Sequence, residues 1–488
     1  MDHVLTLPQL GKTVEVCAGE TVFQALCRAG FPPEAPCGGN GQCGKCRVRV
    51  NGKDCLACRT VIMEDCTVEL PRLPDKLAVL LEGSTERKTE GIPVQSGPLL
   101  AFDIGTTTIA AYLLREDGTI LAEASRRNPQ ARLGADVVTR IQAALHGAME
   151  ELTALVRGAL ADLTVGLSEK TGEKAFGTVC VVGNPCMQQL FLGIRPDNLV
   201  EIPFAPVLTR AQVSPAGDVL PCWQEASLLT VPDLSGYVGA DTLACVLASE
   251  MDIREDITLL VDIGTNGEMV LGNRARRIAC STAAGPALEG ANIRFGMGAA
   301  PGAIDRVEIV EGALSCHVLG DGPALGICGS GLIDAVACLV KLGLVNKRGR
   351  LQTDALFEGE RAVPLSGNVW LTQNDLRQFQ LAKGAIAAGI RLLLRQLGIG
   401  TEAVDRLLLA GAFGSFIRPE SACTVGLLPA ELLAKTSPIG NAAGSGARLM
   451  AESADLFAHS EQVARETEVL ELGSCPDFQL EFAKGMWL

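Results

Sequence analysis

Four cysteines near the N-terminus have the residue type and the spacing to bind an inorganic cluster. Cys37, Cys43 and Cys46 form a C-x5-C-x2-C pattern in a glycine-rich run, and Cys58 follows twelve residues later. A [2Fe–2S] cluster takes four thiolate ligands, and glycines let a loop bend tightly and aim backbone N–H groups at cluster sulfurs. Structural zinc is the alternative. The spacing, one residue longer than the plant type in its first gap, favours a [2Fe–2S] cluster and electron transfer.

The fourth ligand has competitors. Cys55 lies three residues before Cys58, and Cys66 follows eight residues after it. The LACR context of Cys58, ahead of the alternating segment CTVEL, favours Cys58 as the ligand. Cys55 and Cys66 are then expected to be buried or partly buried thiols.

A second kind of chemistry is carried by two strand–turn–strand segments, LLAFDIGTTTIAAYLL (99–114) and ITLLVDIGTNGEMVLG (257–272). Asp103 or Asp262, at the end of an apolar strand, can orient a Mg²⁺-bound water, and the residues that follow can donate hydrogen bonds to phosphate oxygens. Those residues are Gly105, Thr106, Thr107 and Thr108 in the first copy and Gly264, Thr265 and Asn266 in the second. The repetition predicts a nucleotide phosphate site and a duplicated α/β unit.

Three glycine-rich segments could complete a nucleotide site. Residues 404–420 run from an apolar strand into the turn Gly411-Ala412-Phe413-Gly414, where small residues would let a base or ribose approach the backbone. GICGSGLIDAVACL, which contains Gly329 and Ser330, and GNAAGSGARLMA place small residues before an expected helix. The alternative is packing of a helix on a strand for the first segment and tight packing of helices for the other two. No G-x-x-x-x-G-K-[ST] and no strand followed by G-x-G-x-x-G is present, which argues against P-loop and nicotinamide dinucleotide folds.

Bulk composition limits the class of protein. The 488 residues are 48% hydrophobic and carry a net charge of −14, so we expect several domains with large cores and no nucleic-acid surface. The N-terminus has no secretory pattern, and the most apolar long run is interrupted by Arg391 and Arg395. We therefore expect a cytoplasmic protein with no membrane partner, in which the other cysteines are reduced.

The expected organisation is α/β and multidomain. Residues 1–73 read as a β-rich domain with two strands, a helix beginning near Glu20 and the cluster loop. Residues 74–98 read as a linker, in which KLAVLLEG could instead form a short helix. Two subdomains of one ATPase are expected at residues 99–256 and 257–488, the second with a C-terminal strand segment.

Together these motifs resemble the ATP-dependent reductive activators of corrinoid proteins. The likeness covers nearly the whole chain and is strongest in seven segments: CGGNGQCGKCRV with LAC, DIGTTT, PDLSGYVGADTLA, VDIGTNGE, STAAGPALEGANI, GICGSGLIDA and LAGAFGSF. It implies an N-terminal β-grasp [2Fe–2S] ferredoxin domain followed by an ATPase of the acetate and sugar kinase/Hsp70/actin type. It also implies transfer of one electron from the cluster to a partner corrinoid protein, Co(II) to Co(I), driven by ATP. A low-potential donor protein would reduce the cluster, and a homodimer is left open.

By this resemblance Cys37, Cys43, Cys46 and Cys58 hold the cluster, while the two DIGT turns and residues 411–414 surround ATP and Mg²⁺. Asp103 or Asp262 would place the attacking water, and the sequence does not choose between them. Residues 281–305 would either contact the partner or pack beside the nucleotide. Two alternatives share parts of this reading: an activator of a 2-hydroxyacyl-CoA dehydratase, and a redox sensor whose cluster gates partner binding.

Overall fold

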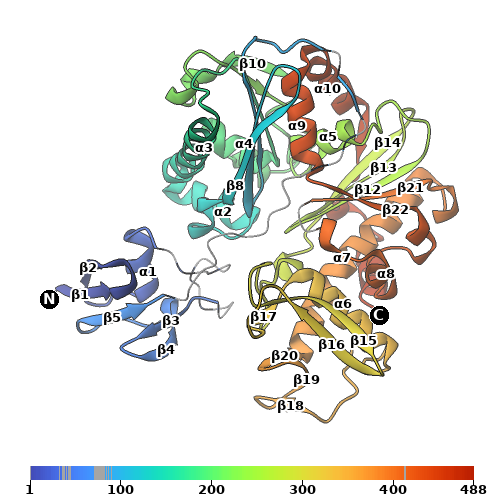
Figure 1. The fold of residues 1–488 in the computed structure, drawn as a ribbon. Coiled ribbons are helices and arrows are strands. Elements are labelled where there is room, and N and C mark those ends of the chain that lie inside the picture. The colour runs from blue at the N-terminus through green and yellow to red at the C-terminus, as the bar shows by residue number, and fades with distance from the viewer. Residues whose placement is uncertain are drawn as a thin grey trace.

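The computed structural model describes residues 2–31, 33, 35, 39, 41, 45–70, 83, 85, 87–89, 91–411 and 414–488. Four residues predicted to form sites lie outside the described residues: Cys37, Cys43, Ala412 and Phe413. The chain forms a small N-terminal domain and two larger α/β lobes (Figure 1). We call these the cysteine module (residues 2–70), the first lobe (residues 99–256) and the second lobe (residues 257–488).

The cysteine module is a five-stranded sheet, ordered β2-β1-β5-β3-β4, with helix α1 packed against it. Its elements are β1 (Asp2–Leu7), β2 (Lys12–Cys17), α1 (Val22–Arg28), β3 (Arg47–Val50), β4 (Lys53–Leu56) and β5 (Cys66–Glu69). The helix begins at Val22 because Thr21 and Gln24 form a capping box, in which each side chain accepts a hydrogen bond from the other's backbone N–H. Buried aliphatic side chains of β1 and α1 share one core.

The first lobe is a mixed six-stranded sheet, ordered β10-β11-β9-β6-β7-β8. Its elements are β6 (Leu99–Ile104), β7 (Thr108–Leu114), β8 (Ile120–Arg127), α2 (Val137–Ala143), α3 (Met149–Thr171), β9 (Thr178–Gly183), α4 (Pro185–Leu192), β10 (Gln212–Pro215), β11 (Ser227–Thr230) and α5 (Ala240–Ala248). Leu100 and Phe102 of β6 face the core that holds α3, and Ala101 faces the core that holds α5. Both faces of β6 are therefore covered, which explains its unbroken apolar sequence.

The second lobe has a six-stranded sheet, ordered β22-β21-β12-β13-β14-β23. Its strands are β12 (Thr258–Ile263), β13 (Gly267–Gly272), β14 (Arg277–Thr282), β21 (Arg406–Ala410), β22 (Thr436–Gly440) and β23 (Thr467–Val469). Its helices are α6 (Gly329–Lys341), α7 (Gln373–Leu397), α8 (Pro419–Thr424), α9 (Ala442–Glu452), α10 (Ala454–Glu466) and α11 (Phe478–Gly485). Two small sheets join it, made of β15 (Ala303–Val310), β16 (Ala313–Val318) and β17 (Gly326–Ile327), and of β18 (Leu356–Phe357), β19 (Glu360–Ser366) and β20 (Val369–Thr372).

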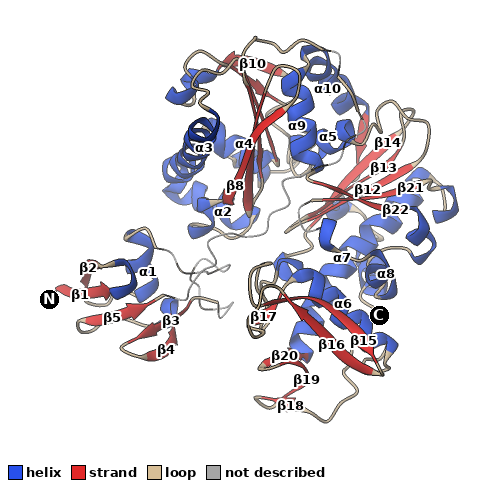
Figure 2. Ribbon diagram, in the orientation of Figure 1, coloured by secondary structure: helices blue, strands red, loops and turns tan. Residues whose placement is uncertain are grey.

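The two large sheets share a core and a strand order. Helices α5 and α9 lie between them (Figure 2), and one buried cluster joins Ala101 of β6 to Leu260 of β12. In each lobe an antiparallel hairpin of three strands is followed by two strands parallel to the first: β8-β7-β6-β9-β11 and β14-β13-β12-β21-β22. Each DIGT turn joins the first two strands of its hairpin, so the same edge of each sheet carries the same motif.

The described part of the predicted linker differs from a flexible tether. Arg87 forms an ion pair with the fully buried Asp252 at 2.7 Å and donates to the carbonyl of Leu247 at the end of α5. The Gln95 backbone N–H donates to Thr178 Oγ1 at 3.0 Å. These partners are about 80 to 165 residues away in the sequence, so the linker's composition gave no sign of them. In the described part of the chain, no helix is both long and apolar enough to cross a bilayer.

Candidate functional site

Both DIGT turns open onto one cavity between the two lobes. In the first turn the Gly105 N–H donates to the Thr108 carbonyl at 3.0 Å, and in the second the Gly264 N–H donates to the Asn266 carbonyl at 3.0 Å. The cavity measures about 510 Å³, within the range of small-molecule sites. The predicted residues that line it are Asp103, Gly105, Thr106, Thr107, Thr108, Asp262, Gly264, Thr265, Asn266, Gly329, Ser330 and Gly411.

Some of the lining residues have hydroxyl groups that already form hydrogen bonds within the protein. The Thr106 hydroxyl accepts from Asn184 Nδ2 at 3.1 Å, so this residue braces the first turn. The Ser330 hydroxyl donates to the Asp305 carbonyl at 2.9 Å, at the start of α6. Gly414 is buried and is not among the lining residues. The candidates with hydroxyls directed between the two turns are Thr107 and Thr265.

The structure gives a reason for glycine at position 411, in the turn that follows β21. Its φ is +87°, and a Cβ there would overlap Oδ1 of Asp262. Because β12 and β21 are parallel neighbours, both end at the same edge of the sheet. Glycine at position 411 therefore lets the end of β21 lie close to the Asp262 carboxylate at the end of β12.

Three carboxylates of this cavity, Asp241, Glu268 and Glu289, were missed by the sequence reasoning. Asp241 lies at the first turn of α5, inside the quoted segment PDLSGYVGADTLA, and Glu268 follows the second DIGT turn. Both stood in recognised motifs, but nothing local to them indicates that they face Asp103 and Asp262. Only the pairing of the two lobes brings these side chains together.

The acidic groups of the cavity affect one another. Burial raises the pKa of Asp103 to about 7, with the carboxylates of Asp241 and Asp262 adding to the rise and a hydrogen bond from Asn441 opposing it. Burial, aided by Asp241, also raises the pKa of Asp262 to about 7. Burial raises the pKa of Asp241 to about 6. A divalent cation would favour the ionised form of all three.

The donor set fits a hydrated magnesium ion. Among the described residues no three Cys, His, Asp or Glu side chains are placed to ligate one metal ion together. Mg²⁺ usually keeps several waters and binds through one or two carboxylates plus substrate phosphates. Asp103, Asp241 and Asp262 are suited to hold those waters at the end of the two turns.

A single carboxylate joins the two turns. Glu289 accepts hydrogen bonds from Thr107 Oγ1 at 3.0 Å and from Thr265 Oγ1 at 3.1 Å, and the two hydroxyl oxygens are 3.3 Å apart. Burial raises the pKa of Glu289, and the two threonine hydrogen bonds oppose the rise. Glu289 ends the short 3-10 helix η8 (Pro286–Glu289), within the small-residue segment 281–305. That segment therefore packs beside the predicted phosphate site.

Four of the six described cysteines of the module form two neighbouring pairs. Cys46 Sγ is 3.1 Å from Cys58 Sγ, beyond disulfide length, and accepts from the Cys58 N–H at 3.5 Å. Cys55 and Cys58 form a C-x2-C pair of the kind found in zinc knuckles. Cys55, however, is a neighbour of Cys66, whose pKa is raised by burial and further by Asp65, Glu64 and Cys55. The geometry thus places Cys46 beside Cys58, and Cys55 near Cys66.

The cysteine module sits at the mouth of the cavity. Phe23, Pro33 and Ala35 line the cavity together with residues of both lobes. Lys45 Nζ donates to the carbonyl of Ile293 at 2.5 Å and to the carbonyl of Gly296 at 2.8 Å. The residue next to Cys46 is therefore hydrogen-bonded to the loop that follows Glu289.

The two lobes have the same strand order, and the cleft between them carries one aspartate-containing turn from each lobe. This arrangement defines an ATPase of the ASKHA class. Residues 256–488 match the family described as the C-terminal domain of RACo, the ASKHA domain, and residues 99–254 match the RACo middle region. The chain is 30% identical over 578 residues to the corrinoid activation enzyme RamQ of Eubacterium limosum, covering 96% of each chain. The chain thus belongs to the family of reductive activators of corrinoid proteins, and it is an enzyme.

Two further similarities agree with this family. The chain is 30% identical over 283 residues to the [Co(II) methylated amine-specific corrinoid protein] reductase of Methanosarcina barkeri, covering 51% of each chain. A solved structure titled reductive activator for corrinoid, iron–sulfur protein is 28% identical, with a TM-score of 0.73, and the match covers 100% of this chain and 98% of that one.

Proposed function

We propose that this enzyme uses ATP to drive the one-electron reduction of a corrinoid protein from Co(II) to Co(I). The observation that carries the proposal is the placement of a cysteine pair on a module at the mouth of an ASKHA nucleotide cavity, in a chain related over 96% of its length to a corrinoid activation enzyme. The corrinoid protein is the substrate, and a low-potential donor protein supplies the electron.

The nucleotide would bind with its phosphates between the two DIGT turns. Thr107 and Thr265 provide hydroxyl donors from opposite lobes, and the N–H groups of the turns add backbone donors. Asp103 and Asp262 orient the waters of Mg²⁺, and Asp241 adds a third carboxylate to the same cation. Because the turns belong to different lobes, a bound nucleotide favours the arrangement in which the lobes are closed.

The cysteine module would hold the cluster through Cys37, Cys43, Cys46 and Cys58. When bound, a [2Fe–2S] cluster accepts and releases one electron at a potential of roughly −400 mV in ferredoxins of the plant type. Each 59 mV of uphill one-electron transfer costs a factor of about ten in the equilibrium constant. A corrinoid couple below the cluster potential therefore needs a driving force, which ATP supplies if the partner binds the two lobe states with different affinity.

The domain plan follows the same division of tasks. We place a ferredoxin-type module at residues 1–73, a connection at 74–98 and the ATPase at 99–488. The shared strand order of the two lobes supports a duplicated unit.

Anaerobic reconstitution with iron and sulfide tests the proposal. We expect two irons per chain, a [2Fe–2S] electron paramagnetic resonance signal after dithionite, and Co(I) formation with a corrinoid protein only when MgATP is added. Co(II) that stays unreduced with MgATP, or reduction that is equally complete without it, would contradict the proposal.

A further inference from the structure

The route from the phosphate site to the cysteine module is short. Glu289 accepts hydrogen bonds from Thr107 and Thr265, and four residues later the Ile293 carbonyl accepts one from Lys45. Lys45 precedes Cys46 in the chain. One short segment therefore contacts both the site that would hold phosphate and the backbone that carries a cluster ligand.

This segment is stiff. The Ala291 N–H donates to the Pro286 carbonyl, the Gly296 N–H to the Ile293 carbonyl, and the Met297 N–H to the Ile327 carbonyl, all at 2.9 to 3.0 Å. A Cβ on Gly296 would overlap the Gly290 carbonyl oxygen, so the loop closes tightly on itself. Residues 286–297 can thus transmit a displacement at one end to the other.

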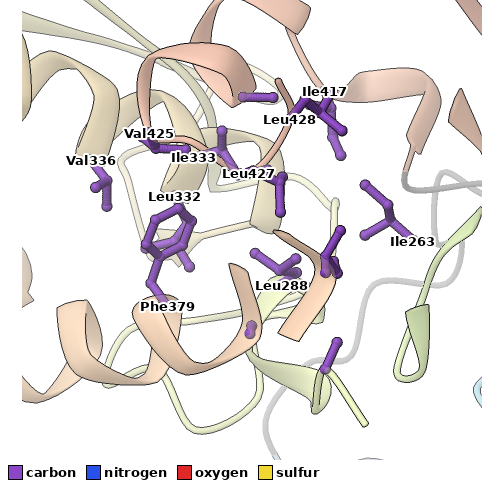
Figure 3. Packing of buried hydrophobic residues seen from close by; sticks show 14 of the residues in the cluster. Ile263, Leu288, Leu332, Ile333, Val336, Phe379, Ile417, Val425, Leu427 and Leu428 are labelled. Atoms are coloured by element: carbon purple, nitrogen blue, oxygen red, sulfur yellow. The ribbon is translucent and has the colours of Figure 1, made fainter. Parts of the chain in front are cut away.

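Two anchors set where the segment can move. Leu288 lies in the buried cluster with Leu332 and Phe379 (Figure 3), and the Arg294 N–H donates to Asp375 at 2.6 Å. Movement is then restricted to small shifts about these points. The contacts of Lys45 at 2.5 and 2.8 Å are sensitive to such shifts, because hydrogen bonds weaken steeply with distance and angle.

Nucleotide phosphate and Glu289 require the same donors. The hydroxyls of Thr107 and Thr265 point to one carboxylate, and an anionic phosphate between the turns would take the same hydrogen bonds and repel that carboxylate. Phe23 of the module also walls the cavity. The structure with the module docked is therefore the one in which the phosphate donors are occupied.

We infer that residues 286–297 couple the nucleotide site to the cysteine module. Phosphate displaces Glu289 from Thr107 and Thr265, the carbonyls of Ile293 and Gly296 shift, and Lys45 releases the module from the cavity mouth. Glu289 is a positioning residue in this scheme. The inference rests on the proposed function, because it assumes that the cavity takes MgATP, and it explains how nucleotide would free the cluster centre to meet a corrinoid protein.

The test uses full-length protein and adenylyl imidodiphosphate with Mg²⁺, with no corrinoid protein present. Docking is measured by hydroxyl-radical footprinting of Phe23, whose side chain belongs to the core of the module, lines the cavity and is only 8% exposed in the docked structure. In the natural sequence we expect the analogue to raise Phe23 oxidation severalfold. If the analogue binds and Phe23 oxidation stays constant, the coupling is refuted while the nucleotide site stands.

The second part of the test uses the thermodynamic linkage between nucleotide binding and docking of the module. If bound nucleotide weakens docking of the module by some factor, then undocking of the module must strengthen nucleotide binding by the same factor. Lys45→Ala should therefore expose Phe23 without nucleotide and lower the Kd of the analogue by about fivefold or more. Lys53→Ala, on the exposed edge of β4, is the matched control and should change neither. An exposed Phe23 with an unchanged Kd in Lys45→Ala would overturn the inference.

Glu289→Gln separates positioning from catalysis. Loss of the charge should lower the Kd of the analogue and make Phe23 oxidation independent of nucleotide. A residue that acted as a base on the attacking water would instead lose ATP turnover with an unchanged Kd, which would refute the positioning role. If the analogue fails to bind the natural protein at all, the proposed nucleotide site itself is contradicted.

Discussion

At the scale of residues, the site depends on carboxyl groups that approach one another only after folding. Asp103 and Asp262 were predicted from their place at the ends of apolar strands, and both line the cavity. Asp241, Glu268 and Glu289 were missed. Asp241 lies about 140 residues from Asp103 in the sequence, and Glu289 lies about 180 residues from Thr107. Local sequence shows that a residue ends a strand or begins a helix, but it does not show which other lobe it will face.

Removing one of these carboxylates should lower ATP turnover and leave the cluster unchanged. We expect Asp262→Asn to keep the visible spectrum of the cluster and to lower ATP turnover by about a hundredfold or more, because a group that orients charge at the reacting centre is lost. Asp218→Asn, on an exposed surface of the first lobe, should leave turnover unchanged. Turnover retained in Asp262→Asn would remove that residue from the site.

The raised pKa values of Asp103 and Asp262, about 7 each, give a pH signature. Their folded-state pKa lies above the unfolded value, so the folded protein binds extra protons between about pH 4 and 7. Their contribution to stability is present below the unfolded pKa and is lost as the pH rises through 7.

Without Mg²⁺, the melting temperature should therefore fall between about pH 4 and 7 more steeply in the natural protein than in the Asp103→Asn, Asp262→Asn double variant. Affinity for Mg²⁺ with nucleotide should rise over the same interval as the carboxyls ionise. Thermal scans and titration calorimetry across this range measure both effects, and parallel pH curves for the two proteins would count against the raised pKa values.

At the scale of elements, the sequence predicted the strands and the helix start well where the signal was local. The helix expected near Glu20 begins at Val22, and both DIGT turns join the predicted strands. The linker was predicted less well, since its described second half is held by Arg87 and other residues against α5 and the first sheet. Composition shows that a segment is polar, whereas its binding to a buried partner depends on the folded surface.

The choice between Cys55 and Cys58 is testable within one strand-to-helix segment. Because Cys58 Sγ lies 3.1 Å from Cys46 Sγ, we expect Cys58→Ser to lose the [2Fe–2S] signal or to shift it strongly. Cys55→Ser should keep the signal, since Cys55 neighbours Cys66 instead. Iron content and electron paramagnetic resonance of the two variants decide the matter, and the opposite pattern would make Cys55 the ligand.

The buried ion pair between Arg87 and Asp252 attaches the segment of residues 74–98 to the first lobe. Arg87→Met leaves Asp252 buried with His459 as a remaining neighbour, so we expect a loss of about 3 kcal/mol in the stability of the first lobe. Arg195→Met removes an exposed ion pair with Asp197 and should change the stability little, because solvent screens exposed charges. Urea unfolding of both variants compares these losses, and equal losses would show that the Arg87 pair does not hold the connection.

At the scale of the whole molecule, the cysteine module and the two lobes have separable tasks. Among the residues that the structure describes, the module contacts the lobes through Lys45 and the residues that line the cavity mouth. The lobes themselves are tied by the shared core around α5 and α9. An enzyme of this design can lose its cluster and still bind nucleotide, so Cys43→Ser should retain the Kd for the ATP analogue while losing cobalt reduction.

The most direct measurement follows the electron itself. Dithionite-reduced protein, freed of excess reductant, is mixed rapidly with a Co(II) corrinoid protein and MgATP while cluster and cobalt absorbance are recorded together. We predict that the cluster reoxidises and Co(I) appears at the same rate, one for one, and that neither change occurs with ADP. Co(I) that forms while the cluster stays reduced, or a cluster that reoxidises without Co(I), would contradict the account.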